Sequence, residues 1–299
     1  MRLAAVDVGT NTARLLVAEL AGGRVLDLER RAVVVGLGTG VDASGRISEA
    51  AIERTVALLG EYRALMTGHR VERFRAVATS ATRDAANASQ FLDRATEVLG
   101  TRPEVIGGPE EAALSFQGAI AGLPGPGPTL VIDVGGGSTE FVVGDDAPLA
   151  ATSIDIGSVR LTERLLVERP ATDEQVAAAT DLARRMFAPV AIPGPPVRAI
   201  GVAGTFTSLA AIHLGLASYD LARVHGSTLT VADLDHLVAT LSPLTIEETA
   251  AIPSLQSDRA PVLLGGAVVV REAVRRCGLG WVTVSETDLL DGIVLGLAG

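Results

Sequence analysis

Two short segments carry the same pattern of residues suited to binding a phosphate chain. VDVGTNTARLLV covers residues 6–17, and IDVGGGSTEFVV covers residues 132–143. They align without a gap at an offset of 126 residues, and the pairs share a carboxylate, a glycine and a hydroxyl: Asp7 with Asp133, Gly9 with Gly135, Thr12 with Ser138. In each segment an apolar run ends in aspartate, a turn of small residues follows, and a second apolar run begins. This pattern predicts one β-hairpin in each half of the chain.

The turns of these hairpins have the residue types that phosphate binding requires. Glycine lets backbone N–H groups come close to a phosphate, and hydroxyl groups add further donors. The predicted phosphate-binding residues are Gly135, Gly136, Gly137 and Ser138 in the second turn and Thr10, Asn11 and Thr12 in the first. One such hairpin could be an ordinary turn. Two in register indicate a duplicated domain with a site between the halves.

Carboxylates next to these turns are candidates for metal binding and acid–base chemistry. Asp133 and Glu140 lie seven residues apart across the second hairpin, where they form either a solvated pair or a Mg²⁺ site. Glu110 and Glu111 follow Pro109 at the start of a predicted helix. First-turn glutamates stabilise a helix by about 0.3–1 kcal/mol each, so their presence alone does not require catalysis. Neighbouring helical positions diverge by about 100°, so we expect only one of the two to face a site.

Helical and strand patterns are mixed throughout the chain, which predicts an α/β fold. The predicted strands are 2–8, 12–20, 74–79, a run from 129, 138–145, 149–155, 198–204 and 281–285. The predicted helices are 48–68, 87–99 with Asn87 as N-cap, 109–121, 158–168, 173–187, 231–241, 259–276 and 286–297. The Pro/Gly-dense stretch GLPGPGPT at 122–129 is the best linker candidate. We therefore predict domain I over 1–123 and domain II over 124–286.

Composition excludes several classes of function. The 299 residues carry a net charge of −10 and a single cysteine, Cys277, and all 25 basic residues are arginine. The lack of lysine excludes a P-loop or Schiff-base lysine, and one cysteine excludes a disulfide framework or a cysteine-cluster metal site. An acidic chain disfavours nonspecific nucleic-acid binding. The N-terminal run is not a signal peptide, and no apolar run is long enough to span a membrane, so we expect a cytoplasmic protein.

The order of these motifs resembles one family over nearly the whole chain. The segments that carry the resemblance are VDVGTNTARLLV, ATSATRDAAN (78–87), GGPEEAALSFQGA (107–119), VIDVGGGSTEFVV, GVAGTFTSLA (201–210), VHGSTLT (224–230) and SDRAPVLLGGAVVV (257–270). The chain is similar to the exopolyphosphatase/guanosine-pentaphosphate phosphatase family in a short, two-domain form. That family belongs to the actin, sugar-kinase and heat-shock ATPase superfamily. The resemblance implies two actin-like (ribonuclease H-like) domains around a cleft, with the last helix, 287–299, returning to domain I.

The resemblance also implies roles for individual residues. It selects Glu111 as the general base or water-positioning carboxylate, and Asp133 and Glu140, with Asp7 as their counterpart, as the Mg²⁺ site, with Mn²⁺ as a second option. Arg14 and Arg83 are candidate clamps for the charge that develops in phosphoryl transfer. Arg83 follows ATSAT at a predicted helix start, where a cation opposes the helix dipole and a bound anion is favoured. The turn from Gly201 to Thr205 either meets a nucleotide or only packs, and His225 in VHGSTLT is expected to be structural.

The function implied is metal-dependent hydrolysis of the terminal phosphoanhydride of inorganic polyphosphate. Short chains are the expected substrates, because the chain is acidic, lacks lysine and lacks the C-terminal domains of longer family members. Three alternatives remain open: hydrolysis of guanosine pentaphosphate, a small-molecule kinase of the same superfamily, and a non-catalytic sensor of polyphosphate or nucleotide. A homodimer is expected by resemblance, with no nucleic-acid or membrane partner.

Overall fold

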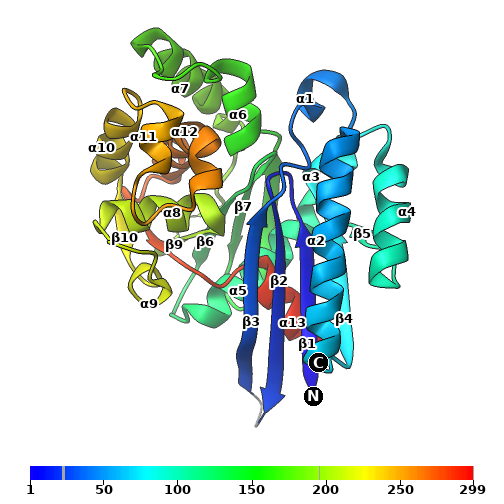
Figure 1. Cartoon of the computed structure of the whole chain (residues 1–299). Helices are drawn as coiled ribbons and strands as arrows, with labels where there is room; N and C mark the ends of the chain where they lie inside the picture. The colour runs from blue at the N-terminus through cyan, green and yellow to red at the C-terminus, as the bar shows by residue number, and fades with distance from the viewer. Residues whose placement is uncertain (22–23, 195, 299) are drawn as a thin grey trace. The chain divides into compact units, whose positions relative to one another are not determined.

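The computed structural model describes residues 1–21, 24–194 and 196–298, which form two compact units (Figure 1). Unit 1 contains Met1–Gly118 and Leu289–Gly299, and unit 2 contains Ala119–Asp288. The division falls inside helix α5 (Gly108–Gly122), five residues before the boundary predicted from the sequence. The Pro/Gly-dense stretch 122–129 therefore follows the crossing and belongs to unit 2. No helix in the described ranges is long and apolar enough to cross a membrane.

Unit 1 is built on a five-stranded sheet in the order β3-β2-β1-β4-β5. Its strands are β1 (Arg2–Val8), β2 (Thr12–Ala21), β3 (Arg24–Val34), β4 (Arg73–Ala78) and β5 (Glu104–Val105). β1, β2 and β3 pair antiparallel in succession, whereas β4 pairs parallel to β1 and β5 parallel to β4. The first hairpin predicted from the sequence is thus the centre of this sheet.

Both faces of the unit 1 sheet are covered by helices, which explains the continuous apolar run of β1. Val6 packs into a cluster with residues of α2 (Glu49–Gly68) and α4 (Ala88–Leu99). Ala5, on the opposite face, packs into a second cluster with α13 (Leu289–Ala298). Figure 1 shows α2 and α4 on one side of the strands and α13, in red, on the other. The short helices α1 (Val41–Ser44) and α3 (Ser80–Asp84) follow β3 and β4.

Unit 2 repeats this strand order and adds one strand at an edge. Its six-stranded sheet has the order β10-β11-β9-β6-β7-β8. The strands are β6 (Thr129–Val134), β7 (Thr139–Gly144), β8 (Pro148–Ile154), β9 (Arg198–Val202), β10 (Thr228–Thr230) and β11 (Trp281–Val284). β6, β7 and β8 form the antiparallel meander, and β9 and β11 extend it in parallel, as β4 and β5 do in unit 1. The duplication seen in the motifs therefore extends to the sheets.

The helices of unit 2 pack around one long buried helix, α12 (Ala260–Cys277). The others are α6 (Ser158–Leu165), α7 (Asp173–Phe187), α8 (Ala203–His213), α9 (Leu221–Val224), α10 (Val231–Leu241) and α11 (Ile246–Ala250), with a 3₁₀ turn at Ser257–Arg259. α12 contacts α6, α7, α8, α10 and α11. Its Val268, Val269 and Val270 are fully buried in the unit 2 core.

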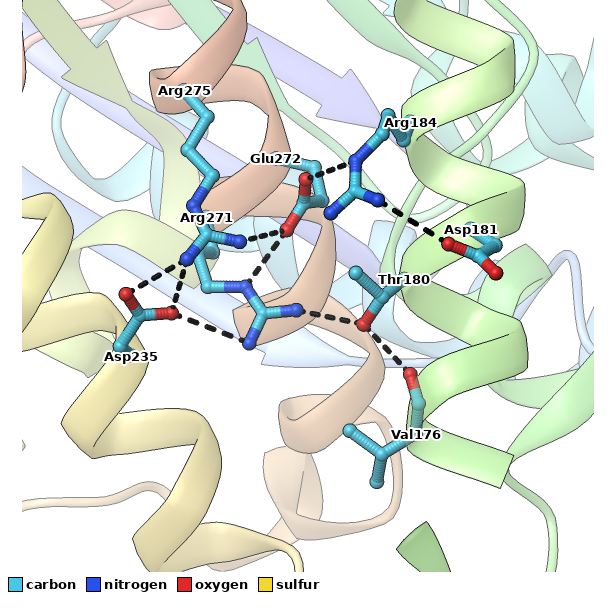
Figure 2. Close-up of polar contacts among 8 residues, drawn as sticks. All are labelled: Val176, Thr180, Asp181, Arg184, Asp235, Arg271, Glu272 and Arg275. Atoms are coloured by element: carbon cyan, nitrogen blue, oxygen red, sulfur yellow. Dashed lines mark hydrogen bonds and ion pairs between the residues drawn. The ribbon is translucent and has the colours of Figure 1, made fainter. Parts of the chain in front are cut away.

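A cluster of ion pairs fixes the C-terminal half of α12 to its neighbours (Figure 2). The buried carboxylate of Glu272 accepts from Arg271 Nε at 2.9 Å and from Arg275 Nη1 at 2.8 Å. Arg184 of α7 lies 3.5 Å from its second oxygen. Asp235 of α10 pairs with Arg275 at 2.6 Å and with Arg271 at 3.5 Å. Glu272 and its arginines thus link α12 to both α7 and α10.

The structure differs from the sequence analysis at three places. β3 was not predicted, because the alternation of Leu26 and Leu28 with acidic residues stops at the charged run 29–31: it is an edge strand, where charged residues are common. Asn87 stands at the N-cap of α4 but makes no cap hydrogen bond. Its side chain instead bonds both backbone groups of Ile47, at 2.8 and 2.9 Å, and so fixes a loop. The last helix begins at Leu289, three residues later than predicted.

The cluster on α12 leads to a stability prediction. Glu272→Gln keeps the shape of the side chain but leaves the buried Arg271 with less compensating charge, so it should lower the unfolding free energy of unit 2 by about 3 kcal/mol. Denaturant unfolding followed by the fluorescence of Trp281, the single tryptophan, reports on this unit. The control is Asp181→Asn, which removes an exposed partner of Arg184 and should cost less than about 1 kcal/mol. Equal losses in both variants would contradict the prediction.

Candidate phosphate-binding site

The turns of the two hairpins have the same backbone geometry. In the first, the amide of Gly9 donates to the carbonyl of Thr12 at 3.0 Å. In the second, the amide of Gly135 donates to the carbonyl of Ser138, also at 3.0 Å. These are the positions that the sequence alignment pairs. One closing hydrogen bond therefore shapes both turns.

In each unit a later segment of the chain binds the carbonyl groups of the turn. The carbonyl of Thr10 accepts from Gly38 at 2.8 Å, and that of Asn11 accepts from Val35 and Gly36 at 2.9 Å. In unit 2 the donors are the first amides of α6. Ser158 donates to Gly135 at 3.0 Å, and Val159 and Arg160 donate to Gly136 at 2.9 and 3.2 Å.

This arrangement leaves amide groups, and not carbonyls, for a ligand. Among the hydrogen bonds of the described residues, none uses the amides of Gly136 and Gly137. Successive unused N–H groups in a turn form a concave anion-binding surface. The α6 N-terminus does not itself face a ligand, because its first amides are already bonded to the turn. The glycine-rich turn is therefore the chemically suited anion-binding element of unit 2.

The hydroxyl groups of the two turns differ in their surroundings. Ser138 is buried, with 2% of its surface exposed. The Thr10 hydroxyl is also buried, and in the described structure it has no hydrogen-bond partner.

The strand residues beside the turns form cross-strand pairs that differ between the units. Asp7 lies opposite Arg14 in the β1–β2 register, and Arg14 donates to Asp7 Oδ2 from Nε at 2.9 Å and from Nη2 at 2.8 Å. Asp133 occupies the equivalent position in unit 2, but its opposite residue is Glu140. A charge-neutral pair in unit 1 therefore corresponds to two acids in unit 2.

The acidic pair of unit 2 is buried. Asp133 is 6% exposed and Glu140 1% exposed, and Ser153 of β8 donates to Glu140 Oε1 at 2.7 Å. Like charges directly opposite each other destabilise a sheet, and a cation or a proton relieves the repulsion. No group of three or more histidine, cysteine, aspartate or glutamate side chains suited to a metal is found in the described structure. Mg²⁺ fits such a two-acid site, since it usually keeps several waters and needs only one or two carboxylates.

The two glutamates of α5 point to different partners. Glu111 Oε2 accepts from Arg83 Nη1 at 2.9 Å, and Arg83 also donates to the carbonyl of Ile106 at 2.8 Å. Glu110 pairs with Arg75 at 2.6 Å and is half exposed. The Glu111 side chain is only 12% exposed. The two side chains therefore diverge, as helical geometry predicts.

The argument from the helix dipole for Arg83 is wrong. Arg83 is the fourth residue of the five-residue α3, so it lies in the last turn and not at the helix start. Its charge is paired with Glu111, because the ends of β4 and the start of α5 are adjacent in unit 1. Arg83 thus orients a carboxylate, a role that the sequence pattern does not indicate.

Sequence reasoning also missed residues that support the second turn. Ser153 lies opposite Glu140 in the β7–β8 register, but that register cannot be read from the sequence. Gly157, just before α6, approaches the turn closely: a Cβ there would lie 2.6 Å from the carbonyl oxygens of Gly135 and Gly136. The only signal for Gly157 is a glycine before a predicted helix, which many loops share.

Two units with one strand order, each with a hairpin turn after its first strand, define the actin-like class of phosphate-binding folds. The chain matches the Ppx/GppA phosphatase family over residues 16–299, and it belongs to that family. The family resemblance and the α/β, two-unit fold predicted from the sequence are both confirmed.

Individual relatives match the chain from end to end. It is 44% identical to Exopolyphosphatase 2 of Mycobacterium tuberculosis, with 100% of this chain and 99% of that protein covered. The crystal structure of the Aquifex aeolicus Ppx/GppA family member is 32% identical to this chain, with a TM-score of 0.84. The match covers 100% of this chain and 97% of that one. An exopolyphosphatase from Cytophaga hutchinsonii is 29% identical, with a TM-score of 0.92 and coverage of 99% of this chain and 97% of that one.

The contact at Gly157 gives a prediction for the phosphate turn. In Gly157→Ala the new methyl group meets backbone atoms, which cannot rotate away, so the turn or α6 must shift at a cost of about 1–3 kcal/mol. Differential scanning calorimetry should show a lower Tm. Gly60→Ala in α2 is the control, because nothing lies within 4 Å of its added Cβ, and the higher helix propensity of alanine should leave Tm unchanged or raise it. An unchanged Tm for Gly157→Ala would show that the turn is not tightly packed.

Proposed function

We propose that this protein is an exopolyphosphatase, a hydrolase that removes the terminal orthophosphate from inorganic polyphosphate. The observation that carries the proposal is the end-to-end match at 44% identity to an exopolyphosphatase. The local chemistry supports it: a turn with unused amides, a pair of buried carboxylates and a glutamate held by an arginine are parts that phosphoanhydride hydrolysis uses.

In the proposed reaction, the amides of Gly136 and Gly137 and the hydroxyl of Ser138 bind the terminal phosphoryl group. Thr10 to Thr12 are the corresponding phosphate-binding residues of the first turn, in unit 1. Glu111, oriented by Arg83, positions a water molecule in line with the terminal phosphoanhydride and accepts its proton. The water oxygen forms a bond to the terminal phosphorus, and the bond to the bridging oxygen breaks. Orthophosphate and a chain shorter by one unit are the products.

We propose that Mg²⁺, or Mn²⁺ in its place, is held by Asp133 and Glu140. A bound divalent cation would neutralise negative charge on the phosphate oxygens. Asp7 is a weaker candidate ligand than its counterpart Asp133, since one of its oxygens already accepts two hydrogen bonds from Arg14. Arg14 in turn has its charge partly neutralised by Asp7, so its effect on the substrate would be smaller than that of an unpaired arginine.

The substrate can be identified by measuring phosphate release from polyphosphates of defined length, with guanosine pentaphosphate and ATP in parallel. Inorganic polyphosphate should give the highest kcat/KM, and short chains should exceed chains of hundreds of units, because the protein carries a net charge of −10 and no lysine. Preference for guanosine pentaphosphate would favour the alternative hydrolase, and ADP formation that depends on an acceptor would favour a kinase. Cytoplasmic location and a homodimer stay predictions.

The proposed base is tested by Glu111→Gln. Glutamine keeps a hydrogen bond to Arg83 but cannot accept the proton, so kcat should fall by at least about 100-fold. The loss of a partly buried ion pair and of dipole stabilisation should cost about 1 kcal/mol, so the variant should remain folded. Equilibrium binding of polyphosphate should be retained.

Glu110→Gln is the matched control for this variant. It also removes a first-turn charge and an arginine partner, but Arg75 keeps its second partner, Glu104. It should retain most of the activity. Equal losses in the two variants, or an inactive Glu110→Gln alone, would show that Glu111 is not the base.

The proposed metal site has a readout that does not depend on activity. EDTA should abolish hydrolysis and Mg²⁺ or Mn²⁺ should restore it, and Mg²⁺ should raise the Tm of the wild-type protein because an ion that binds only the folded state stabilises that state. Glu140→Gln should lose the increase in Tm caused by Mg²⁺, because it removes one of the two proposed carboxylate ligands while it keeps an acceptor for Ser153. The exposed Asp145→Asn should behave like wild type. An equal response to Mg²⁺ in all three proteins would place the metal elsewhere.

A further inference from the structure

A row of polar side chains crosses the three antiparallel strands of unit 2 beside the glycine-rich turn. Asp133 of β6 lies opposite Glu140 of β7, and Glu140 lies opposite Ser153 of β8. Residues directly opposite each other in antiparallel strands carry their side chains on the same face of the sheet. Phe141, which follows Glu140, packs in the unit 2 core, so the row from Asp133 to Ser153 lies on the other face.

The last two members of this row are hydrogen-bonded to each other. The Ser153 hydroxyl donates to Glu140 Oε1 at 2.7 Å. Glu140 is only 1% exposed, whereas Ser153 is partly exposed on β8, the edge strand of the sheet. Hydrogen bonds from a hydroxyl to an ionised carboxylate are about twice as strong as bonds between neutral groups. This bond holds one of the two oxygens of Glu140 and so fixes the plane of its carboxylate.

The corresponding row of unit 1 has alanine where unit 2 has serine. Asp7 lies opposite Arg14, and Arg14 lies opposite Ala32 of β3. Arg14 is oriented by its own two hydrogen bonds to Asp7, so the third position of that row needs no polar group. The serine thus occurs in the unit whose second position is a carboxylate. The two differences between the units fit a single purpose, which is to hold a carboxylate in a fixed orientation in unit 2.

The orientation of a carboxylate matters most for a cation with strict geometry. Mg²⁺ requires near-ideal octahedral coordination at about 2.0–2.1 Å, whereas Ca²⁺ accepts longer and more variable bonds. Groups that hydrogen-bond to metal ligands orient those ligands, and their loss typically costs about 10–100-fold in metal affinity or activity. A carboxylate held through one oxygen presents its remaining lone pairs in fixed directions, which suits Mg²⁺.

We propose that Ser153 is a positioning residue, which orients the carboxylate of Glu140 for binding Mg²⁺ and so sets the affinity of unit 2 for this cation. This inference rests on the metal site proposed at Asp133 and Glu140. Ser153 acts only through its hydrogen bond to Glu140, and in this role it contacts neither the cation nor the substrate.

The test measures the Kd for Mg²⁺ from the dependence of Tm on Mg²⁺ concentration, with no substrate present. Ser153→Ala removes the hydroxyl, and its Kd should rise by at least about 10-fold. Ser153→Thr keeps a hydroxyl and should restore a Kd close to that of the wild type. Thr152→Val is the matched control: it removes a hydroxyl from the same strand, but Thr152 lies opposite Phe141 on the other face, so Kd should not change.

A second cation separates the orientation of Glu140 from general damage to the sheet. The same titration with Ca²⁺ should show a smaller rise in Kd for Ser153→Ala than the titration with Mg²⁺, because Ca²⁺ tolerates a less rigid set of ligands. A variant whose sheet is merely loosened would lose affinity for both cations alike. The selectivity for Mg²⁺ over Ca²⁺ is therefore the quantity that reports on positioning.

Each outcome bears on the proposal. A wild-type Kd for Mg²⁺ in Ser153→Ala overturns it, and so does an equal loss in Thr152→Val or an equal loss for Mg²⁺ and Ca²⁺. If Ser153→Ala does not fold, Ser153→Val and Ser153→Thr, which have nearly the same shape and differ in the hydroxyl, must differ in Kd, and equal values overturn the proposal.

The failure of this inference can be told apart from that of the proposed function. If Mg²⁺ does not raise the Tm of the wild-type protein, the proposed metal site and the role of Ser153 both fail. If the Kd values change as expected but the wild-type protein releases no phosphate from polyphosphate, the proposed activity fails and the role of Ser153 is supported.

Discussion

The site depends on one backbone constraint: in each hairpin turn the carbonyl groups are bound by a later segment of the same unit. Once Gly135 and Gly136 accept from the first amides of α6, the turn cannot rotate its peptide planes without losing those bonds. The peptide groups are then held with their N–H groups available. In unit 1 the residues from Val35 to Gly38 do the same for Thr10 and Asn11, although no helix is involved. The duplication has thus kept the function of the supporting segment while changing its structure.

The same scaffold has diverged in charge at the residues beside the turns. The cross-strand register places residue 7 opposite residue 14 and residue 133 opposite residue 140. The residue type at position 14 or 140 therefore sets the net charge of the pair beside each turn. With arginine at position 14, the aspartate of unit 1 is neutralised within the protein. With glutamate at position 140, unit 2 has two buried carboxylates opposite each other. That difference is the reason for proposing the metal site in unit 2, and it shows that two nearly identical hairpins need not have identical roles.

The sequence was sufficient to predict what is determined locally. Apolar runs and small-residue turns identified both hairpins, and the i, i+1 divergence on a helix separated Glu110 from Glu111. Contacts between segments distant in the sequence were not accessible in this way. Asn87 has the residue type of an N-cap, but a competing loop backbone at Ile47 binds its side chain. Arg83 looked like a free cation because Glu111, 28 residues away, does not appear in any local pattern. The edge strand β3 was missed because a run of charged residues, 29–31, interrupts its short apolar alternation.

The phosphate turn of unit 2 also depends on residues that never approach a ligand. The amides of α6 can bond to the turn only if α6 lies close to it. The position of α6 depends in turn on α12, which packs against it. Gly265 of α12 permits this, since a Cβ there would lie 2.2 Å from Thr162 Oγ1 and 2.9 Å from the carbonyl of Ser158. Gly265 and Gly266 contribute no side-chain packing of their own at this contact. The buried Glu272 and its arginines supply a restraint at the other end of the helix. We therefore interpret the buried ion pairs of α12 as groups that fix the orientation of this helix, which the small residues at its contact with α6 cannot do. In this way they contribute to placing the turn, although burying charge is costly.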